Sequence, residues 1–360
     1  MSLQDIVSAV ESRQRLDMNG ARELYEKADF HLLGHLAHRR RMEKHPAPLV
    51  TYVVDRNINY SNVCVCGCRF CAYFRPPGHP GAFVLSQEEL AVKIEETLAL
   101  GGTQILMQGG HHPDLPLSFY EEMMGFIKDR FPTIHIHSFS PPEIVHFAKI
   151  EKVPTSAVIS RLRGAGLDSI PGGGAEILVD SVRRRISPNK CSAAEWLNVM
   201  EEAHAQGLRT TATMMFGHEE EPVHRLEHLF ALRDLQDRTG GFTAFIPWTF
   251  QPKNTGIQRP AETAVSYLRL LAVSRLVLDN FDNIQASWVT MGPKVSQLAL
   301  HFGANDFGST MIEENVVAAA GVRFRLSREE ICRIIEGAGF RAGQRTMAYE
   351  LCDEIPENAV

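Results

Sequence analysis

Short β-rich runs that alternate with longer helical segments constrain the fold of this chain more than any other feature. The runs lie at residues 50–57, 104–108, 134–139, 167–170, 210–216, 243–250, 284–288 and 298–302. Strands that alternate with helices indicate parallel βαβ units. Eight such units favour a closed barrel over an open sheet, so we predict an α/β fold, a (β/α)8 barrel of the TIM type.

Helix signals divide the chain further. Ser86, Ser192 and Ser327 each precede a glutamate by three residues, the capping-box pattern in which both side chains satisfy free backbone N–H groups. Apolar residues at helical spacing also occur before residue 48. We therefore predict an N-terminal helical extension over residues 1–48, the barrel over 49–310 and a C-terminal helical extension over 311–360.

Polar or glycine-rich clusters follow most of the predicted strands. The loops at the carboxyl ends of the strands form the active site of an α/β barrel. The sequence therefore predicts one site that is dispersed along the chain and convergent in space. In chain order the clusters are Asn59 and Asn62 with nearby cysteines, residues 108–111, Ser138 and Ser140, residues 172–174, Gly217 and His218, Gln251, and Asn305 and Asp306.

Charge and hydropathy exclude several classes of protein. The chain has 360 residues and a formal net charge of −6, without the basic stripe that is typical of nucleic-acid binding. No apolar run reaches the length of a membrane span, and the first residues lack the pattern of a signal peptide. We expect a cytoplasmic protein that neither inserts into a membrane nor binds nucleic acid.

Four of the seven cysteines lie between positions 64 and 71. In a reducing compartment, clustered thiols indicate a metal site rather than disulfides. Cys64, Cys68 and Cys71 form a C-x3-C-x2-C pattern, and thiolates suit iron–sulfur clusters and zinc. Cuboidal clusters usually take four cysteines, so three would leave one iron free to bind a small molecule.

A structural zinc site is the alternative for this loop. Zinc sites of that kind pair one C-x2-C with a second pair or with histidines at a set spacing. Cys66 does not fit the C-x3-C-x2-C spacing, so we treat it as a non-ligand. The isolated cysteines are expected to be buried apolar residues; they are Cys191, Cys332 and Cys352.

The cysteine motif follows the first predicted strand and carries an aromatic residue, Phe70, before its last cysteine. In both respects it resembles the motif of the radical S-adenosylmethionine (SAM) superfamily. The resemblance implies that Cys64, Cys68 and Cys71 ligate one [4Fe–4S] cluster, whose fourth iron binds the amine and carboxylate of SAM. It also implies that Phe70 lies near the adenine and that a flavodoxin- or ferredoxin-type protein supplies electrons.

Longer segments are similar to one family within that superfamily. Residues 56–62, 108–115 and 171–177 resemble a subgroup that acts on nucleoside-like or aromatic substrates, and residues 184–190, 210–218 and 241–252 resemble the cyclic dehypoxanthinyl futalosine synthases. Met291 departs from the glutamine that is usual there.

That family works in the futalosine route to menaquinone, and the resemblance implies one reaction on a small-molecule substrate. The 5′-deoxyadenosyl radical takes a hydrogen atom from the ribose part of dehypoxanthine futalosine. The sugar radical adds to the benzoate ring, and loss of an electron and a proton restores aromaticity. Aminofutalosine synthase of the same pathway, or a related radical SAM synthase on an aromatic substrate, is the alternative.

The same resemblance makes several strand-end residues candidates for SAM binding. Gly109 and Gly110 match a glycine motif where the backbone approaches a ligand closely, although a tight turn is the alternative. Glu176 occupies a SAM-holding position, or is a first-turn carboxylate that a helix dipole favours. Arg183, two helical turns later, suits a carboxylate of SAM or of the substrate. The remaining candidates are Ser140, Asn305 and Asp306.

The final proton loss requires a base, and histidine titrates near neutral pH. The candidates at strand ends are His111, His112 and His218. His135 and His137 alternate with apolar neighbours in the third predicted strand, so they are expected to face the barrel interior.

Aromatic residues close the sixth predicted strand. Trp248 and Phe250 with Gln251 suit a benzoate-bearing substrate, because such a pocket combines apolar walls with a few polar groups. Asn254 follows as a further substrate candidate. Ordinary barrel packing is the alternative for Trp248.

Two classes without catalysis are the remaining alternatives. An electron-carrying iron–sulfur protein is expected to be shorter and to carry a fourth cysteine ligand. A non-catalytic SAM-binding barrel is expected to lack polar clusters at nearly every strand end.

Overall fold

A curved sheet of seven parallel strands forms most of a barrel in the computed structural model, which describes residues 2–352. The strands follow one another around the sheet in chain order, as βαβ units require. They are β2 (Asp55–Ile58), β3 (Gln104–Met107), β4 (His135–Ser138), β5 (Ser169–Ile170), β6 (Arg209–Phe216), β7 (Phe242–Thr249) and β8 (Asn283–Ile284).

A second, smaller sheet closes the ring. β1 (Leu49–Val53) runs into β2 with one residue between them, and it pairs in parallel with β9 (Asp306–Ser309). A parallel bridge between Gln285 and Asp306 joins β9 to the residue that follows β8. β9 is therefore the eighth barrel strand, and the predicted (β/α)8 barrel is confirmed.

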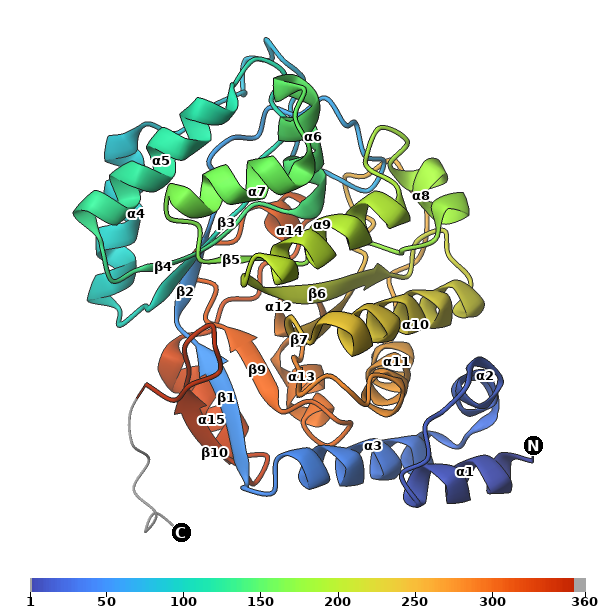
Figure 1. Cartoon of the computed structure of the whole chain (residues 1–360). Coiled ribbons are helices and arrows are strands. Elements are labelled where there is room, and N and C mark those ends of the chain that lie inside the picture. Colours follow the sequence, from blue (N-terminus) through green and yellow to red (C-terminus); the bar gives the residue numbers. More distant parts are fainter. Residues whose placement is uncertain (1, 353–360) are drawn as a thin grey trace.

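Helices cover the outside of this barrel (Figure 1). Ser86 and Ser192 form the capping boxes that the sequence indicates. The covering helices are α4 (Gln87–Ala99), α5 (Leu117–Arg130), α6 (Pro141–Glu151), α7 (Thr155–Gly164), α8 (Asp180–Ile186), α9 (Ala193–Ala205), α10 (Pro222–Thr239) and α11 (Ala264–Val277).

The predicted eighth strand is wrong. Residues 298–302 lie at the end of α13 (Pro293–Ala299) and in the turn after it, and the strand is Asp306–Ser309 instead. A short apolar run fits a helix as well as a strand, and here Leu298 is exposed while Ala299 and Leu300 are buried. Trp288 likewise begins helix α12 (Trp288–Met291) rather than ending a strand.

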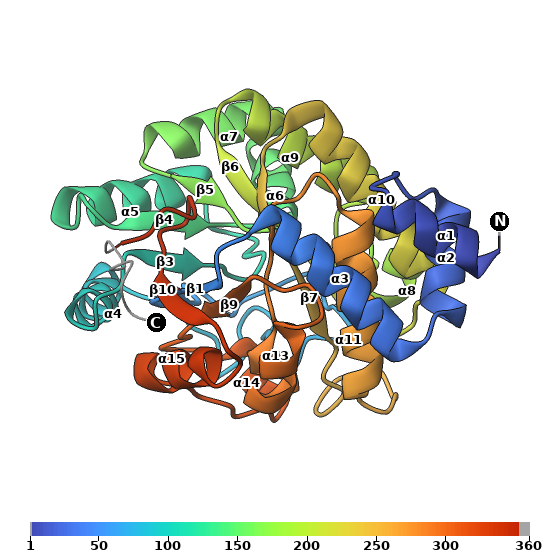
Figure 2. The same cartoon turned by 90° about the horizontal axis from the view of Figure 1, so that it is seen from below.

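Helices α1 (Leu3–Glu11), α2 (Met18–Lys27) and α3 (Phe30–Lys44) precede the barrel, and α3 packs along α11 (Figure 2). The last described segment holds α14 (Val316–Ala319), α15 (Arg328–Glu336) and β10 (Arg341–Gln344). β10 pairs in parallel with β1, so the predicted all-helical C-terminal extension is wrong at this strand. The extension belongs to the sheet that closes the barrel. Its predicted end, residues 353–360, lies outside the described residues.

Within residues 2–352, the longest apolar stretches of helix are too short or too polar to cross a membrane.

Candidate active site

The cysteine loop follows β2 and is held by backbone hydrogen bonds to distant parts of the chain. The N–H of Cys64 donates to the carbonyl of Arg75 (2.9 Å), and the N–H of Val65 donates to the carbonyl of His111 (3.1 Å). The N–H of Arg69 donates to the carbonyl of Ile186 in α8 (2.8 Å). The loop is therefore positioned by the strand ends around it rather than by its own sequence alone.

The four thiols of the loop are not equivalent. A hydrogen bond from Cys66 lowers the pKa of Cys64 to about 6, and the same thiol lowers the pKa of Cys68. Sharing its proton with these two raises the pKa of Cys66. Cys66 Sγ also lies 3.0 Å from His111 Nδ1. Burial raises the pKa of Cys71 as well. Thiolates are the form that binds metal, so these shifts favour Cys64 and Cys68 over Cys66 as ligands, and the assignment of Cys71 rests on its spacing.

The spacing of side chains in this part of the fold differs from that of a single-ion site. Across residues 2–352, three His, Cys, Asp or Glu side chains do not converge closely enough to hold one metal ion. A cuboidal iron–sulfur cluster binds each thiolate at a different iron, so its ligands lie farther apart.

A buried charged pair lies beside the thiols. Glu176 has a left-handed backbone (φ 40°) and is buried. Its Oε1 accepts a hydrogen bond from Lys190 Nζ (3.0 Å), which lies 5.1 Å from the centroid of the Phe70 ring. Oε2 is buried without a hydrogen-bond partner. An orphaned carboxylate oxygen at a strained residue fits a ligand that brings its own donor, such as the amine or ribose of SAM.

Arg183 supports the loop that carries this carboxylate. It is buried, and its guanidinium donates to the carbonyls of Gly174, Ala175 and Cys191. Its NH1 forms an ion pair with Glu176 Oε2 at 3.7 Å, a distance too long for a hydrogen bond. The predicted direct contact with a ligand carboxylate is therefore less favoured by this geometry than a supporting role.

The two glycines after β3 are required by packing inside the protein. A Cβ at Gly109 would lie 2.2 Å from the Tyr60 ring, and one at Gly110 would lie 2.0 Å from the carbonyl oxygen of Val63. The close approach that the sequence predicts is real, but its partner in this structure is the segment leading into the cysteine loop.

Glu143 is a site residue that the sequence reasoning missed. It is fully buried and accepts hydrogen bonds from Tyr60 Oη (2.5 Å), Ser140 Oγ (2.5 Å) and the N–H of Gly109 (3.1 Å). Burial raises the pKa of its carboxyl from 4.5 to about 7. The predicted SAM candidate Ser140 is thus tied to this carboxyl. A carboxylate in the first turn of a helix that follows a strand end was the available signal.

The three histidines predicted as bases differ in how their ring nitrogens are engaged. His218 Nδ1 accepts from the N–H of Glu219 (2.7 Å) and Nε2 faces the carbonyl of Met215 (3.0 Å), so neither nitrogen is free for a substrate. His111 contacts Cys66, and burial lowers its pKa well below 6.5. His112 accepts from the N–H of Asp114 (3.2 Å) at the loop surface.

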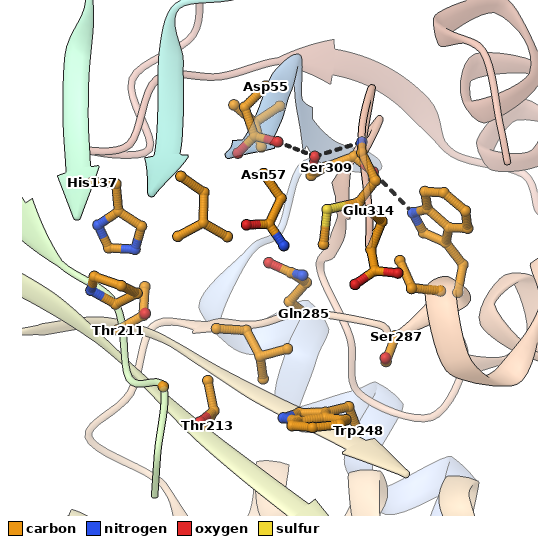
Figure 3. Close-up of a pocket in the computed structure, with 18 of the residues that line it drawn as sticks. Asp55, Asn57, His137, Thr211, Thr213, Trp248, Gln285, Ser287, Ser309 and Glu314 are labelled. Atoms are coloured by element: carbon orange, nitrogen blue, oxygen red, sulfur yellow. Dashed lines mark hydrogen bonds between the residues drawn. The ribbon is translucent and has the colours of Figure 1, made fainter. Parts of the chain in front are cut away.

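The barrel interior contains a cavity of about 260 Å³ (Figure 3). Its floor is formed by the segment after β10, through Arg345, Met347 and Tyr349. Its walls carry polar groups as well as apolar ones; they include Asp55, Asn57, Gln104, His137, Thr211, Thr213, Trp248, Gln285, Ser287, Ser309 and Glu314. Such a mixture suits a substrate with an aromatic ring and a sugar.

Of the predicted substrate residues, Trp248 lines this cavity and three do not. Phe250 is buried in the core, and Gln251 donates to Thr249 beside it. Asn254 is exposed and donates to the carbonyl of Ala319, which fastens the loop to α14. Met291 packs from outside, with its sulfur 3.2 Å from Thr249 Oγ1.

Asn305 and Asp306 lie at the opposite end of the barrel from the cysteines. The prediction that they end the last strand is wrong, because β9 begins at Asp306. Asn305 accepts from Arg275 (2.6 Å), and Asp306 pairs with Arg345 (2.5 and 2.9 Å). Both side chains are saturated by protein partners, so this geometry gives them a role in barrel closure.

The closed barrel, its thiol loop and the orphaned carboxylate define an α/β-barrel enzyme with a site for a soft metal centre and a cationic cofactor. A family model described as the radical SAM superfamily matches residues 58–232, and one described as the CofH/MqnC C-terminal region matches residues 239–359. The chain belongs to the radical SAM superfamily, whose members use a [4Fe–4S] cluster and SAM.

Named relatives align with nearly the whole chain. The cyclic dehypoxanthine futalosine synthase of Halalkalibacterium halodurans is 46% identical over 98% of this chain and 95% of its own length. That of Streptomyces coelicolor is 45% identical over 97% and 88%. The 5-amino-6-(D-ribitylamino)uracil–L-tyrosine 4-hydroxyphenyl transferase of Methanopyrus kandleri is 42% identical over 91% and 90%.

A solved structure supports the fold. The FeFe-hydrogenase maturase HydG of Carboxydothermus hydrogenoformans superposes with a TM-score of 0.76, covering 96% of this chain and 80% of its own, at 16% identity.

Proposed function

We propose that this chain converts dehypoxanthine futalosine to its cyclic form, a carbon–carbon bond-forming step of menaquinone biosynthesis. The observation that carries the proposal is the near-full-length similarity to two cyclic dehypoxanthine futalosine synthases. The cavity below the thiol loop agrees in chemistry, since Trp248 offers an aromatic wall and amide and hydroxyl groups surround it.

The proposal assigns Cys64, Cys68 and Cys71 as the cluster ligands and leaves Cys66 as a protonated neighbour. When bound, the cluster and SAM supply a 5′-deoxyadenosyl radical. Glu176 is assigned to SAM through Oε2, which has no hydrogen-bond partner, and Phe70 to the adenine. Ser140, Gly109 and Gly110 belong to the wall around the cofactor. A flavodoxin- or ferredoxin-type protein is the proposed reductant, and the cytoplasmic location expected from the sequence stays a prediction.

The residues of the barrel then have three tasks. They hold the ribose within reach of the radical, keep the benzoate ring against the carbon that loses hydrogen, and exclude water from the carbon radical. The floor of the cavity, formed by Arg345, Met347 and Tyr349, contributes to the last task. One hydrogen atom leaves the ribose, one carbon–carbon bond forms, and one electron and one proton leave the ring.

The hydroxyphenyl transferase reaction is the second candidate, because relatives of that name are 42% identical over most of the chain. Aminofutalosine synthase remains the alternative that the sequence left open. All three act on aromatic groups, so the shape of the cavity alone does not separate them.

Anaerobic incubation with alternative substrates tests the proposal. Reconstituted protein receives SAM and dithionite with dehypoxanthine futalosine in one arm, and with tyrosine plus 5-amino-6-(D-ribitylamino)uracil in another. We expect 5′-deoxyadenosine and a product two hydrogens lighter than the substrate in the first arm. Turnover in the second arm alone, or 5′-deoxyadenosine without that product, would refute the assignment.

A further inference from the structure

Two histidines and a serine form a chain of contacts from the cavity to the outside of the barrel. His137 Nδ1 lies 2.6 Å from Ser169 Oγ, and His135 Nε2 lies 2.7 Å from the same oxygen. His137 and His135 are two residues apart on β4, so both side chains point to the same face, and Ser169 stands beside them on β5.

The two ends of this chain of contacts differ in exposure. His137 is 5% exposed and lines the cavity, where Figure 3 shows it beside Thr211. Ser169 is fully buried, whereas His135 is half-buried at the first residue of the strand. The path thus leads from the cavity to the amino-terminal end of the barrel, away from the thiol loop.

We propose that His137 takes the proton that the benzoate ring loses, and that Ser169 and His135 carry the charge out of the barrel. This inference rests on the proposed function. His137 is then a catalytic residue, while Ser169 and His135 are positioning residues that act through it.

Atoms and electrons balance in this step. After the carbon–carbon bond has formed, the ring gives one electron to an acceptor of the iron–sulfur or flavodoxin class. The ring C–H bond then breaks, its electron pair restores the aromatic system, and the proton goes to His137 Nε2. His137 Nδ1 passes its own proton to Ser169 Oγ, whose hydroxyl proton moves to His135 Nε2. Water restores the starting tautomer once the product has left.

The charges around His137, Ser169 and His135, which together form the relay, favour proton transfer from His137 to His135. Burial lowers the pKa of His137 well below 6.5, and the nearby His135 and Arg345 act in the same sense, so its ring is neutral and can accept a proton. Burial also lowers the pKa of His135, but this ring is only half-buried, and the Asp168 carboxylate opposes the lowering while Lys128, which pairs with Asp168 (2.6 Å), adds to it. A proton is therefore held more easily at the outer end than at the inner end.

Other titratable groups suit the task less well. His218 has both nitrogens engaged by its own loop. Asp55 also lines the cavity, but its two oxygens accept from Ser309 Oγ and from Gln104 Nε2. Neither group continues into a chain of hydroxyl and imidazole contacts that leads outward.

The test compares two products of one reaction. In His137→Gln, 5′-deoxyadenosine formation changes by less than about threefold, while cyclic product per 5′-deoxyadenosine falls about 100-fold. Ser169→Ala interrupts the relay with both rings in place, so the ratio falls about tenfold and the isotope effect of a ring-deuterated substrate rises. Ser169→Thr keeps a hydroxyl and restores the ratio.

His204→Gln is the matched control, because His204 is a half-buried histidine, like His135, that also contacts two hydroxyls, Thr239 and Thr210, outside the cavity. It leaves the ratio unchanged. If wild-type protein forms no cyclic product, the proposed function fails and the relay with it. If wild type forms product and Ser169→Ala keeps both its ratio and its isotope effect, the relay alone is refuted, even where His137→Gln does not fold.

Discussion

The two ends of the barrel differ in how completely their buried carboxylates are hydrogen-bonded. At the thiol end, Glu176 keeps one carboxylate oxygen buried without a hydrogen bond, although Arg183 lies 3.7 Å from it. At the other end, Asp306 is saturated by Arg345, Thr51 and a backbone N–H. Unsatisfied buried groups cost free energy, so they persist where a ligand supplies the missing partner. The comparison assigns chemistry to one end of the barrel and closure to the other.

Removal of a thiol is the most drastic way to probe the first end. We expect Cys68→Ala to abolish both cluster-bound iron and 5′-deoxyadenosine formation, because three ligands are needed in the proposed site. Iron analysis and anaerobic turnover measure the two effects. Cys332→Ala in α15 should leave both intact, and full iron content with activity in Cys68→Ala would contradict the ligand assignment.

Removal of a charge at the closing end should affect stability instead. Arg345→Ala leaves Asp306 buried without its cation, which we expect to lower the free energy of unfolding by about 3–5 kcal/mol. Urea unfolding measures the change. Arg15→Ala, which breaks an exposed pair with Asp237 and Asp279, is the control and should cost less than about 1 kcal/mol. Equal losses would remove the contrast between buried and surface pairs.

The raised pKa of Glu143 predicts a pH effect at the thiol end. Because the pKa of this carboxyl is about 7 in the folded protein against an ordinary value of 4.5, the folded state binds more protons between these values. Its contribution to stability is therefore present below pH 4.5 and is lost as pH rises through 7, by about 3 kcal/mol at most. Urea unfolding at about pH 5 and pH 7.5 measures the slope, and Glu143→Gln should reduce it. An identical slope in that variant would assign the effect to other groups.

The Glu176 oxygen that lacks a hydrogen bond gives the smallest predicted effect. Glu176→Gln should weaken SAM binding to the cluster-loaded protein about tenfold, as loss of one charged hydrogen bond implies. Isothermal titration measures the affinity, with the surface variant Glu121→Gln as control. Unchanged affinity would place SAM away from this carboxylate.

Local patterns predicted much of the fold. Capping boxes at Ser86, Ser192 and Ser327 begin helices as expected, because the pattern requires neighbours within one turn. The strand Asp306–Ser309 was not predicted, because an aspartate and a glycine weaken the sequence pattern of a strand. In the fold Asp306 is stabilised by Arg345, which lies 39 residues later. The missing signal was therefore a long-range contact.

In the predicted site too, local positions were predicted and long-range contacts were not. Sequence position placed His218 and Arg183 near strand ends, but their hydrogen-bond partners turn both inward to the backbone. His137 was expected to face the interior, and it does line the cavity. Its connection through Ser169 became visible only when β4 and β5 were side by side.

The sequence by itself determined the alternation of strands and helices and the spacing of the thiols, because both depend on neighbours along the chain. The tertiary structure decided which strand ends meet at the cofactor side, which carboxylates are saturated and which histidine faces the cavity. Burial and pairing depend on residues that are distant in the chain. The orphaned oxygen of Glu176 and the saturated oxygens of Asp306 therefore look alike in sequence and differ only in the folded protein.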